Sequence, residues 1–434
     1  MSSKQSPEAR ARLSTTAAFI GTAIEWYDFF IFGTAAALVF GTVFYPEASP
    51  ASALMASFAT FWVGFLARPI GGIIFGHLGD RIGRKNILVI TLVMMGVATT
   101  CIGLLPGYAT WGTMAPIALV LLRAVQGLAV GGEWGGAVVL ATENSSEERK
   151  GWAGMWVQQG SPAGSILSTL VFIAVGQLDD KQFLSWGWRI PFLLSAVLVI
   201  VGLLIRLRVE ESKEFEEVRE RQDEVRVPLA EVFRVAPLVV LLGVGASVMG
   251  IASAYFNNTF TLAWATTDLG IDRQKMLNIL LVGAMAQFLW QPVAARFSSR
   301  FGAARVMIVG LSFCALMIVP KFLALISTQA LPIIVTLILS TVGSTAYYAM
   351  LASFLSAAFP ANVRYTGVSV AYQLCATLIG GATPLIGQAL LNSTGGSPWA
   401  VAAFYGSLLL VTAVSVAALA RHLNKKTAPE MVAA

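Results

Sequence analysis

Five charged side chains inside long apolar segments are the residues best suited to do chemistry in this chain. Glu25 and Asp28 lie three residues apart in the first segment, so they share one face of a helix. Glu133 lies in the fourth segment, and Arg68 and Arg123 lie in the second and fourth. An ionised side chain in apolar surroundings is costly, so it indicates an ion or substrate pathway. Carboxyl groups there can carry protons, and arginines can bind anions.

Proton transfer is the chemistry predicted for the acids. Desolvation favours the protonated form of a carboxyl group, whereas a nearby guanidinium favours the charged form. Residues 273–429 contain no Asp or Glu, so an acid that carries a proton must lie in the first half. We expect the proton-coupling group to comprise Asp28, Glu133, Glu25 and Arg123. The alternative is a permanent structural ion pair.

Arg123 has a second predicted role, because a guanidinium can bind a carboxylate through two parallel hydrogen bonds. Protonation of one of the three acids would bring the site near neutrality, so an anion would not be repelled. Uncharged polar side chains in the apolar segments are further candidates for substrate binding, although each amide could equally bridge helices. As a set they favour a polar substrate, and they are Tyr27, Gln126, Gln158, Gln159, Asn257, Asn258, Gln287, Gln291, Tyr347, Tyr348 and Gln373.

The composition indicates that these residues are carried by membrane-spanning helices. Of 434 residues, 56% are hydrophobic and 12% charged, whereas a soluble domain has about 25% charged residues. A helix needs about 20 apolar residues to cross a bilayer. Twelve segments qualify, namely 16–43, 52–76, 87–105, 115–141, 152–178, 187–207, 236–266, 274–295, 305–326, 331–358, 365–391 and 398–420.

The polar stretch in the middle of the chain divides the twelve segments six and six. We therefore predict an all-α membrane protein with two pseudo-symmetric six-helix bundles. Glycine runs at 127–136 and 160–164 predict close helix packing. The predicted domains are a cytoplasmic N-terminal tail (1–15), a first bundle (16–207), a cytoplasmic central loop (208–235), a second bundle (236–420) and a cytoplasmic C-terminal tail (421–434).

The distribution of lysine and arginine predicts the orientation of the chain. Most of the 29 Lys and Arg residues lie between segments on the same side as the N-terminus, which the positive-inside rule places in the cytoplasm. Both termini are therefore expected to be cytoplasmic, and the net charge of +6 reflects topology rather than nucleic-acid binding. The residues assigned to the outer side are Lys181, Arg189, Arg273, Lys275 and Lys321.

The loop after the second segment carries a recognisable signature. Residues 76–85 read GHLGDRIGRK, which resembles the cytoplasmic motif G-x-L-A-D-R-x-G-R-K of the major facilitator superfamily. The resemblance implies that this loop is a cytoplasmic gate. A fainter echo occurs at Arg300-Phe301-Gly302, where Ser299 stands in place of the aspartate. The gate residues implied by the first motif are Gly76, Asp80, Arg81, Gly83, Arg84 and Lys85.

Further motifs resemble the metabolite:proton symporter family within that superfamily. They are the R-x-x-Q-G pattern from Arg123 to Gly127, the run around Glu25 and Asp28, and residues 64–72, 183–192 and 359–367. The resemblance implies a proton-coupled importer of a small polar metabolite. We expect an organic acid of the shikimate, dicarboxylate or aromatic-acid type, moved by alternating access through a bacterial plasma membrane. No cofactor other than the proton, and a monomeric state, are expected.

Alternative functions remain open from the sequence. One is uptake of a zwitterion such as proline or betaine, and another is proton-driven export of metabolites or drugs. The run from Trp156 to Gly164 lacks the glycine pattern of such exporters. An enzyme is disfavoured, because the two histidines and three isolated cysteines form no metal spacing and no phosphate-binding loop is present.

Overall fold

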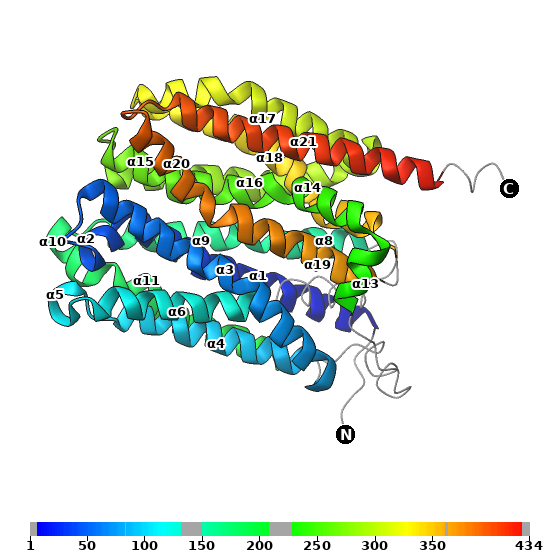
Figure 1. Ribbon diagram of the computed structural model, residues 1–434, viewed down its shortest axis with the longest axis horizontal. Coiled ribbons are helices and arrows are strands. Elements are labelled where there is room, and N and C mark those ends of the chain that lie inside the picture. Colours follow the sequence, from blue (N-terminus) through cyan, green and yellow to red (C-terminus); the bar gives the residue numbers. More distant parts are fainter. Residues whose placement is uncertain (1–6, 83, 132–149, 208–227, 361–362, 428–434) are drawn as a thin grey trace. The chain divides into compact units, whose positions relative to one another are not determined.

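The computed structural model describes the whole chain except residues 1–6, 83, 132–149, 208–227, 361–362 and 428–434 (Figure 1). The regular elements of the described part are helices, with short π-helical turns at three places. In chain order they are α1 (Pro7–Leu38), α2 (Phe40–Phe44), α3 (Pro50–Ile82), α4 (Arg84–Leu104), α5 (Tyr108–Trp111), α6 (Met114–Gly131), α8 (Lys150–Gln158), α9 (Gly160–Val175), α10 (Asp180–Gln182), η2 (Phe183–Gly187), α11 (Arg189–Arg206), α13 (Pro228–Val235), α14 (Pro237–Tyr255), η3 (Phe256–Phe260), α15 (Thr261–Thr267), α16 (Arg273–Phe301), α17 (Ala303–Ile326), α18 (Ala330–Ala358), α19 (Arg364–Cys375), η5 (Ala376–Gly380), α20 (Ala382–Ser393) and α21 (Trp399–Thr427).

The helices confirm the prediction of an all-α membrane protein. Ten helical stretches of the described residues are long and apolar enough to cross a bilayer, and they match predicted segments two to four and six to twelve. Helices α1 and α2 cover the first predicted segment except residue 39, and α8 and α9 cover most of the fifth. The described helices therefore overlap all twelve predicted spans, and residues 132–141 of the fourth lie outside the described part.

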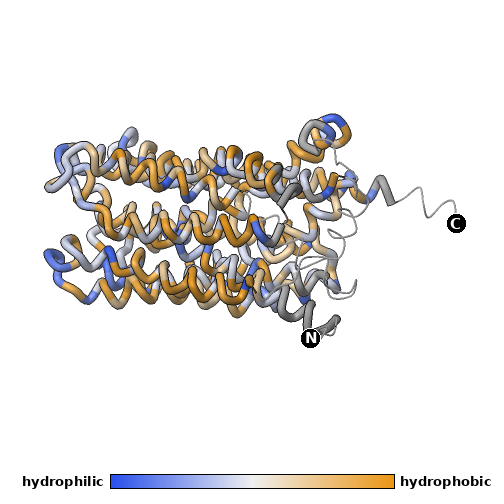
Figure 2. The backbone as a smooth tube through the Cα atoms, turned by 90° about the horizontal axis from the view of Figure 1, so that it is seen from below, coloured by the Kyte–Doolittle hydropathy of each residue, from blue (hydrophilic) through white to orange (hydrophobic). Residues whose placement is uncertain are grey.

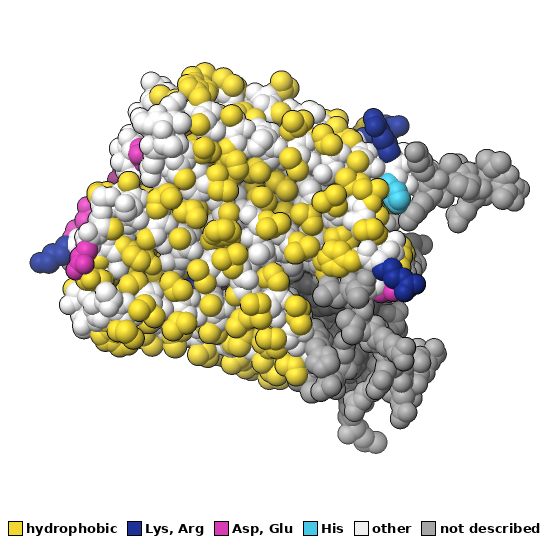
Figure 3. Space-filling model, in the orientation of Figure 1, with side chains coloured by type: hydrophobic (Ala, Val, Ile, Leu, Met, Phe, Trp, Pro, Cys, Tyr) yellow, Lys and Arg dark blue, Asp and Glu magenta, His cyan; other side chains and the backbone are white. Residues whose placement is uncertain are grey.

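Hydrophobic side chains lie on the outside of these helices as well as within them. Hydrophobic residues, drawn in orange, predominate along the helices, and hydrophilic residues gather near their ends (Figure 2). The displayed face is largely covered by hydrophobic side chains (Figure 3). Leu289, Leu316 and Leu331 are 69%, 70% and 71% exposed, although each lies in a span. Such exposure is unfavourable in water and is expected against lipid.

The chain forms two compact units. The first comprises Met1–Glu224 and Asn258–Ala284, and the second comprises Val225–Asn257 and Met285–Ala434. In the first unit α1 packs against α9 and α11, and α4 packs against α6 and α11. In the second unit α14 packs against α19 and α21, and α17 packs against α18 and α21. The same four pairings thus occur among corresponding spans, which is typical of repeat-built transporters.

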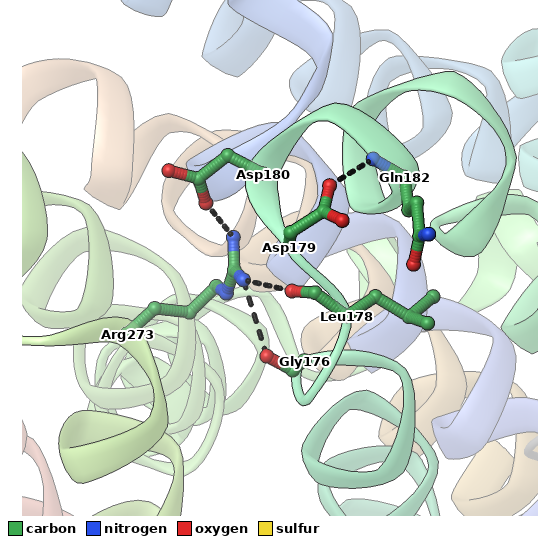
Figure 4. A network of polar contacts seen from close by, with 6 residues as sticks. All are labelled: Gly176, Leu178, Asp179, Asp180, Gln182 and Arg273. Carbon is green, nitrogen blue, oxygen red and sulfur yellow. Dashed lines mark hydrogen bonds and ion pairs between the residues drawn. The ribbon is translucent and has the colours of Figure 1, made fainter.

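Arg273 attaches the segment Asn258–Ala284 to the first unit. Its Nη1 donates to Asp180 Oδ1 at 3.1 Å, and its Nη2 donates to the carbonyls of Gly176 and Leu178 at 3.1 and 3.2 Å (Figure 4). The guanidinium carbon also lies 3.9 Å from the centre of the Phe183 ring. Because Asp180 is 87% exposed, the ion pair itself contributes little, and the carbonyl and ring contacts hold the start of α16 in place.

Glycines bring the backbones of α3 and α6 into direct contact. A Cβ atom added at Gly127 would overlap the carbonyl of Gly64, and one at Gly131 would overlap the carbonyl of Arg68. Gly71 has the same relation to Leu128. These contacts confirm the close packing predicted for Gly127 and its neighbours, and they carry Arg123 on α6 against α3.

Replacing Gly127 by alanine is expected to destabilise the first unit. The added methyl group meets backbone rather than a mobile side chain, so the helices must separate, at a cost of about 1–3 kcal/mol or more. We expect a lower midpoint of thermal unfolding in detergent and a smaller yield of monodisperse protein. Gly154→Ala is the matched control, because a Cβ atom there meets no atom within 4 Å. Equal unfolding midpoints for the two variants would contradict the packing argument.

Candidate functional site

Asp28 is held at the centre of the first unit by hydroxyl groups from two other spans. It lies on α1 and is 0% exposed. Ser195 on α11 donates its hydroxyl to Asp28 Oδ1 at 2.5 Å, and Thr99 on α4 donates to Asp28 Oδ2 at 3.0 Å. Both oxygens of the carboxyl group therefore accept a hydrogen bond from a hydroxyl group. Three helices far apart in sequence therefore meet at one carboxyl group.

The hydrogen-bonded chain continues from Thr99 to Arg123. The amide nitrogen of Gln126 donates to Thr99 Oγ1 at 2.7 Å, and Arg123 Nη1 donates to Gln126 Oε1 at 3.1 Å. Asp28, Thr99, Gln126 and Arg123 thus form a continuous chain across α1, α4 and α6, which we call the Asp28–Arg123 chain. All four side chains are buried, so each link is stronger than it would be in water.

Aromatic rings surround the guanidinium group of Arg123. Its central carbon lies 4.1 Å from the centre of the Phe32 ring, 4.2 Å from that of Phe29 and 4.9 Å from that of Phe61. Its Nε donates to the backbone carbonyl of Phe61 at 3.3 Å. Gly64 leaves room for the group, since a Cβ atom there would overlap it. Cation–π contacts of this kind stabilise a desolvated cation by about 2 kcal/mol or more.

The other buried arginines of the first unit have different surroundings. Arg68 lies 4.3 Å from the centre of the Phe29 ring and 4.4 Å from that of Phe65, so it shares one ring with Arg123. Arg206 is buried at the end of α11 and donates to the carbonyl of Leu88. Its guanidinium lies against Gly21, where an added Cβ atom would overlap it.

Three other candidates of the first unit are buried but differ in their hydrogen-bond partners. Glu25 is buried on α1, a turn before Asp28. Tyr27 is also buried, and its hydroxyl donates to the carbonyl of Pro191 at 2.7 Å, so it joins α1 to α11. Gln158 is 1% exposed, and neither polar atom of its amide has a hydrogen-bond partner in the described structure. Such an amide is suited to bind a ligand or water.

The candidates of the second unit include several unpaired amide groups. Gln291 is 0% exposed, and both of its amide atoms lack a hydrogen-bond partner within the described chain. The side-chain oxygen of Gln373 also lacks one. The hydroxyl of Tyr347, by contrast, donates to the carbonyl of Ala246 and so joins α18 to α14. Of the other candidates of this unit, Tyr348 is buried, and Gln287 and Asn257 are half-buried. The two remaining candidates lie in the first unit, where Gln159 is buried and Asn258 is half-buried.

Some predicted residues cannot be placed. Glu133 and Gly83 lie outside the described residues. The side chains of the other gate residues are likewise outside the described part, although their backbone belongs to α3 and α4. Those residues are Gly76, Asp80, Arg81, Arg84 and Lys85.

The two hydroxyl partners of Asp28 in the first unit, and one buried cation in the second unit, were not among the residues identified from the sequence. Thr99 and Ser195 hold Asp28, but isolated hydroxyl residues are common in membrane helices and give no signal. Lys321, which was assigned to the outer side from the sequence, lies in α17 and is buried within the second unit with an exposure of 3%. Its position inside the ninth predicted segment (305–326) was the feature of the sequence that indicated a buried charge. In the described part of the chain, no cluster of three His, Cys, Asp or Glu side chains could hold a metal ion.

Comparisons with known proteins agree with this architecture. The family model of the Major Facilitator Superfamily matches residues 18–384. The chain is 41% identical over 412 residues to the shikimate transporter of Escherichia coli K12, covering 94% of each protein. It is 39% identical to the inner membrane metabolite transport protein YhjE of the same organism, covering 87% of this chain and 88% of the relative.

More distant relatives extend the comparison. The proline/betaine transporter of Escherichia coli K12 is 33% identical, with 89% of this chain and 79% of the relative covered. The crystal structure of a D-xylose–proton symporter superposes with a TM-score of 0.75 at 17% identity, covering 94% of this chain and 97% of the other. That likeness concerns the fold. The chain is thus a multi-pass membrane transporter that belongs to the Major Facilitator Superfamily and groups with its shikimate, metabolite and proline/betaine transporters.

Proposed function

We propose that this protein imports a small organic acid together with a proton by alternating access. The observation that carries the proposal is the buried Asp28–Arg123 chain, which joins one carboxyl group to one guanidinium through two polar side chains. Proton binding at Asp28 would change its hydrogen bonds to Thr99 on α4 and Ser195 on α11. Through Thr99 it would also affect Gln126 on α6.

Thr99 provides a physical means of sensing the proton. Its single hydroxyl proton has two acceptors within reach, Asp28 Oδ2 at 3.0 Å and the Met95 carbonyl of its own helix at 2.9 Å. An ionised Asp28 attracts that proton, since charged acceptors form the stronger bond. A protonated Asp28 releases it to Met95 and loosens the contact between α1 and α4. The two states of the carboxyl group therefore favour two arrangements of the helices.

Arg123 is proposed to act in this coupling rather than as the main clamp for a carboxylate. Its guanidinium is enclosed by phenylalanine rings and already donates to Gln126 and to Phe61. Its positive charge favours the ionised form of nearby acids. Protonation of an acid in this unit would shift the local charge by one unit and prepare the site for an anionic substrate.

An organic acid is the substrate class that we favour. The relative at 41% identity is a shikimate transporter, whereas the proline/betaine transporter is 33% identical. The unpaired amides of Gln158 in the first unit and Gln291 in the second are suited to hydroxyl and carbonyl groups of a substrate, and the unpaired side-chain oxygen of Gln373 is suited to a hydroxyl group. A zwitterion is the second candidate, and the proline/betaine relatives support it.

A ligand screen followed by transport assays tests the proposal. Purified protein would be heated in the presence of shikimate, dicarboxylates, aromatic acids, proline and betaine at acid and neutral pH, because a ligand that binds the folded state raises the unfolding midpoint. We expect a hydroxylated carboxylate to give the largest shift, and to accumulate in proteoliposomes only when the outside is acidic. A shift by betaine or proline alone would instead support the zwitterion, and accumulation without a pH gradient would contradict proton coupling.

A further inference from the structure

Lys321 is a buried cation of the second unit that the proposed coupling mechanism does not use. It lies five residues before the end of α17, which is about 7.5 Å along a helix axis. Its side chain is 3% exposed. Nζ donates to Asn257 Oδ1 at 2.5 Å and lies 5.0 Å from the ring centres of both Phe256 and Tyr405.

No carboxylate neutralises this ammonium group in the described structure. Among the described residues no Asp or Glu oxygen lies within ion-pairing distance of Nζ, and residues 273–429 contain no acidic residue. A buried charge without a counter-ion is costly, because the loss of hydration is only partly offset by an amide and two ring faces. An ammonium also has three donors, and one protein acceptor receives a hydrogen bond from it here.

The groups next to Lys321 combine aromatic rings with an unpaired hydroxyl group. The rings of Phe256 and Tyr405 lie 4.5 Å apart, and the buried Tyr405 hydroxyl has no hydrogen-bond partner in the described part of the chain. Asn257 lies in the π-helical turn η3, a local widening of the helix that is frequent at functional sites. Pro320 removes one backbone hydrogen bond beside Lys321, so this turn of α17 can adjust to a ligand.

We propose that Lys321, Asn257 and the Tyr405 hydroxyl form an anion-binding site that takes the carboxylate of the transported acid. This inference rests on the proposed function and assigns to the second unit the group that binds the carboxylate of the substrate. The ammonium and the hydroxyl donate to the carboxylate oxygens, and the aromatic rings exclude water from the pair. Asn257 keeps Lys321 oriented while the site holds no ligand. The opposing explanation is that Lys321 and Asn257 serve only to join α17 to η3.

Asn257→Asp separates the two explanations without leaving a cavity. The new carboxylate is isosteric with the amide and would form an ion pair with Lys321. The ammonium group would then be neutralised and no longer available to the carboxylate of the ligand. As a structural tether this pair is at least as strong as the original hydrogen bond. We expect an unchanged or higher unfolding midpoint, together with a loss of shikimate affinity of at least about tenfold, the effect of one charge-assisted hydrogen bond.

Lys321→Met and a neutral probe complete the experiment. Shikimate and its methyl ester would be titrated against the wild type, Lys321→Met, Asn257→Asp and the control Lys181→Met, whose lysine is exposed in α10. Both site variants should lose affinity for the acid but bind the ester as the wild type does, and Lys181→Met should behave as the wild type.

Undiminished binding of the acid in both site variants would contradict the proposed anion-binding site. If Lys321→Met does not fold, the result for Asn257→Asp decides alone. If the wild type binds none of the screened acids, the proposed function itself fails.

Discussion

Asp28→Asn is expected to abolish proton-driven accumulation while leaving the exchange of substrate intact. For one coupled proton, a pH difference of one unit corresponds to about 1.36 kcal/mol, or about tenfold accumulation. Asparagine cannot take up and release the proton, so internal and external substrate should only equalise. Binding and helix movement should survive, because one of the two hydroxyls, of Thr99 or Ser195, can turn to accept from the new NH2 group while the other still donates to the amide oxygen. The measurement is uptake into proteoliposomes with an imposed pH gradient, compared with counterflow without one.

A pair of adjacent threonines supplies a control for the network itself. Thr99→Val removes the hydroxyl that lies between Asp28 and Gln126, whereas Thr100→Val removes one that donates to the Gly96 carbonyl of the same helix. The first variant should couple poorly and the second normally. Normal accumulation by Asp28→Asn would show that Asp28 does not carry the coupled proton, and equal defects in the two threonine variants would show that the hydrogen-bonded chain is not the sensor.

Arg123→Ala is expected to lower both the rate of uptake and the apparent affinity for the substrate. The change leaves Gln126 Oε1 without its Arg123 donor, removes the additional donor to the carbonyl of Phe61 and takes the cation away from the surrounding rings. Loss of hydrogen bonds from a charged donor costs about 1.5–3 kcal/mol each, which is about tenfold to a hundredfold in an equilibrium constant. Because proton and substrate binding are linked, a disturbed proton site weakens substrate binding as well. Initial rates of uptake over a range of substrate concentrations measure both effects.

Arg68→Ala is the matched control for this second prediction. Arg68 is buried to a similar degree and contacts Phe29 as Arg123 does, yet among the described residues no hydrogen bond joins it to the Asp28–Arg123 chain. Its removal should affect the unfolding midpoint more than the pH dependence of uptake. Arg123→Lys keeps the charge but not the planar fork and should be intermediate. Wild-type uptake by Arg123→Ala would exclude the proposed role of Arg123, and an equal defect in Arg68→Ala would assign the effect to packing.

The family and the class of fold could be predicted from the sequence because they depend on local patterns. Apolar segments long enough to span a bilayer are visible without any contact map, and ten helices of the described chain match them. The signature at residues 76–85 and the pattern from Arg123 to Gly127 are short and continuous. Close packing at Gly127 and Gly164 also followed from composition, since small residues are what helix crossings in membranes need.

The environment of each charge was decided by tertiary structure. Asp28 receives its hydrogen bonds from residues 71 and 167 positions away, so no local pattern could identify Thr99 and Ser195 as its partners. The same holds for Lys321, whose partner Asn257 is 64 positions away and whose burial depends on the packing of aromatic rings from α17, η3 and α21. The sequence by itself determined that charges lie within the membrane-spanning helices. Only the packing of those helices decided which charges have which partners, because hydrogen bonds and cation–π contacts act over a few ångströms between side chains that are distant along the chain.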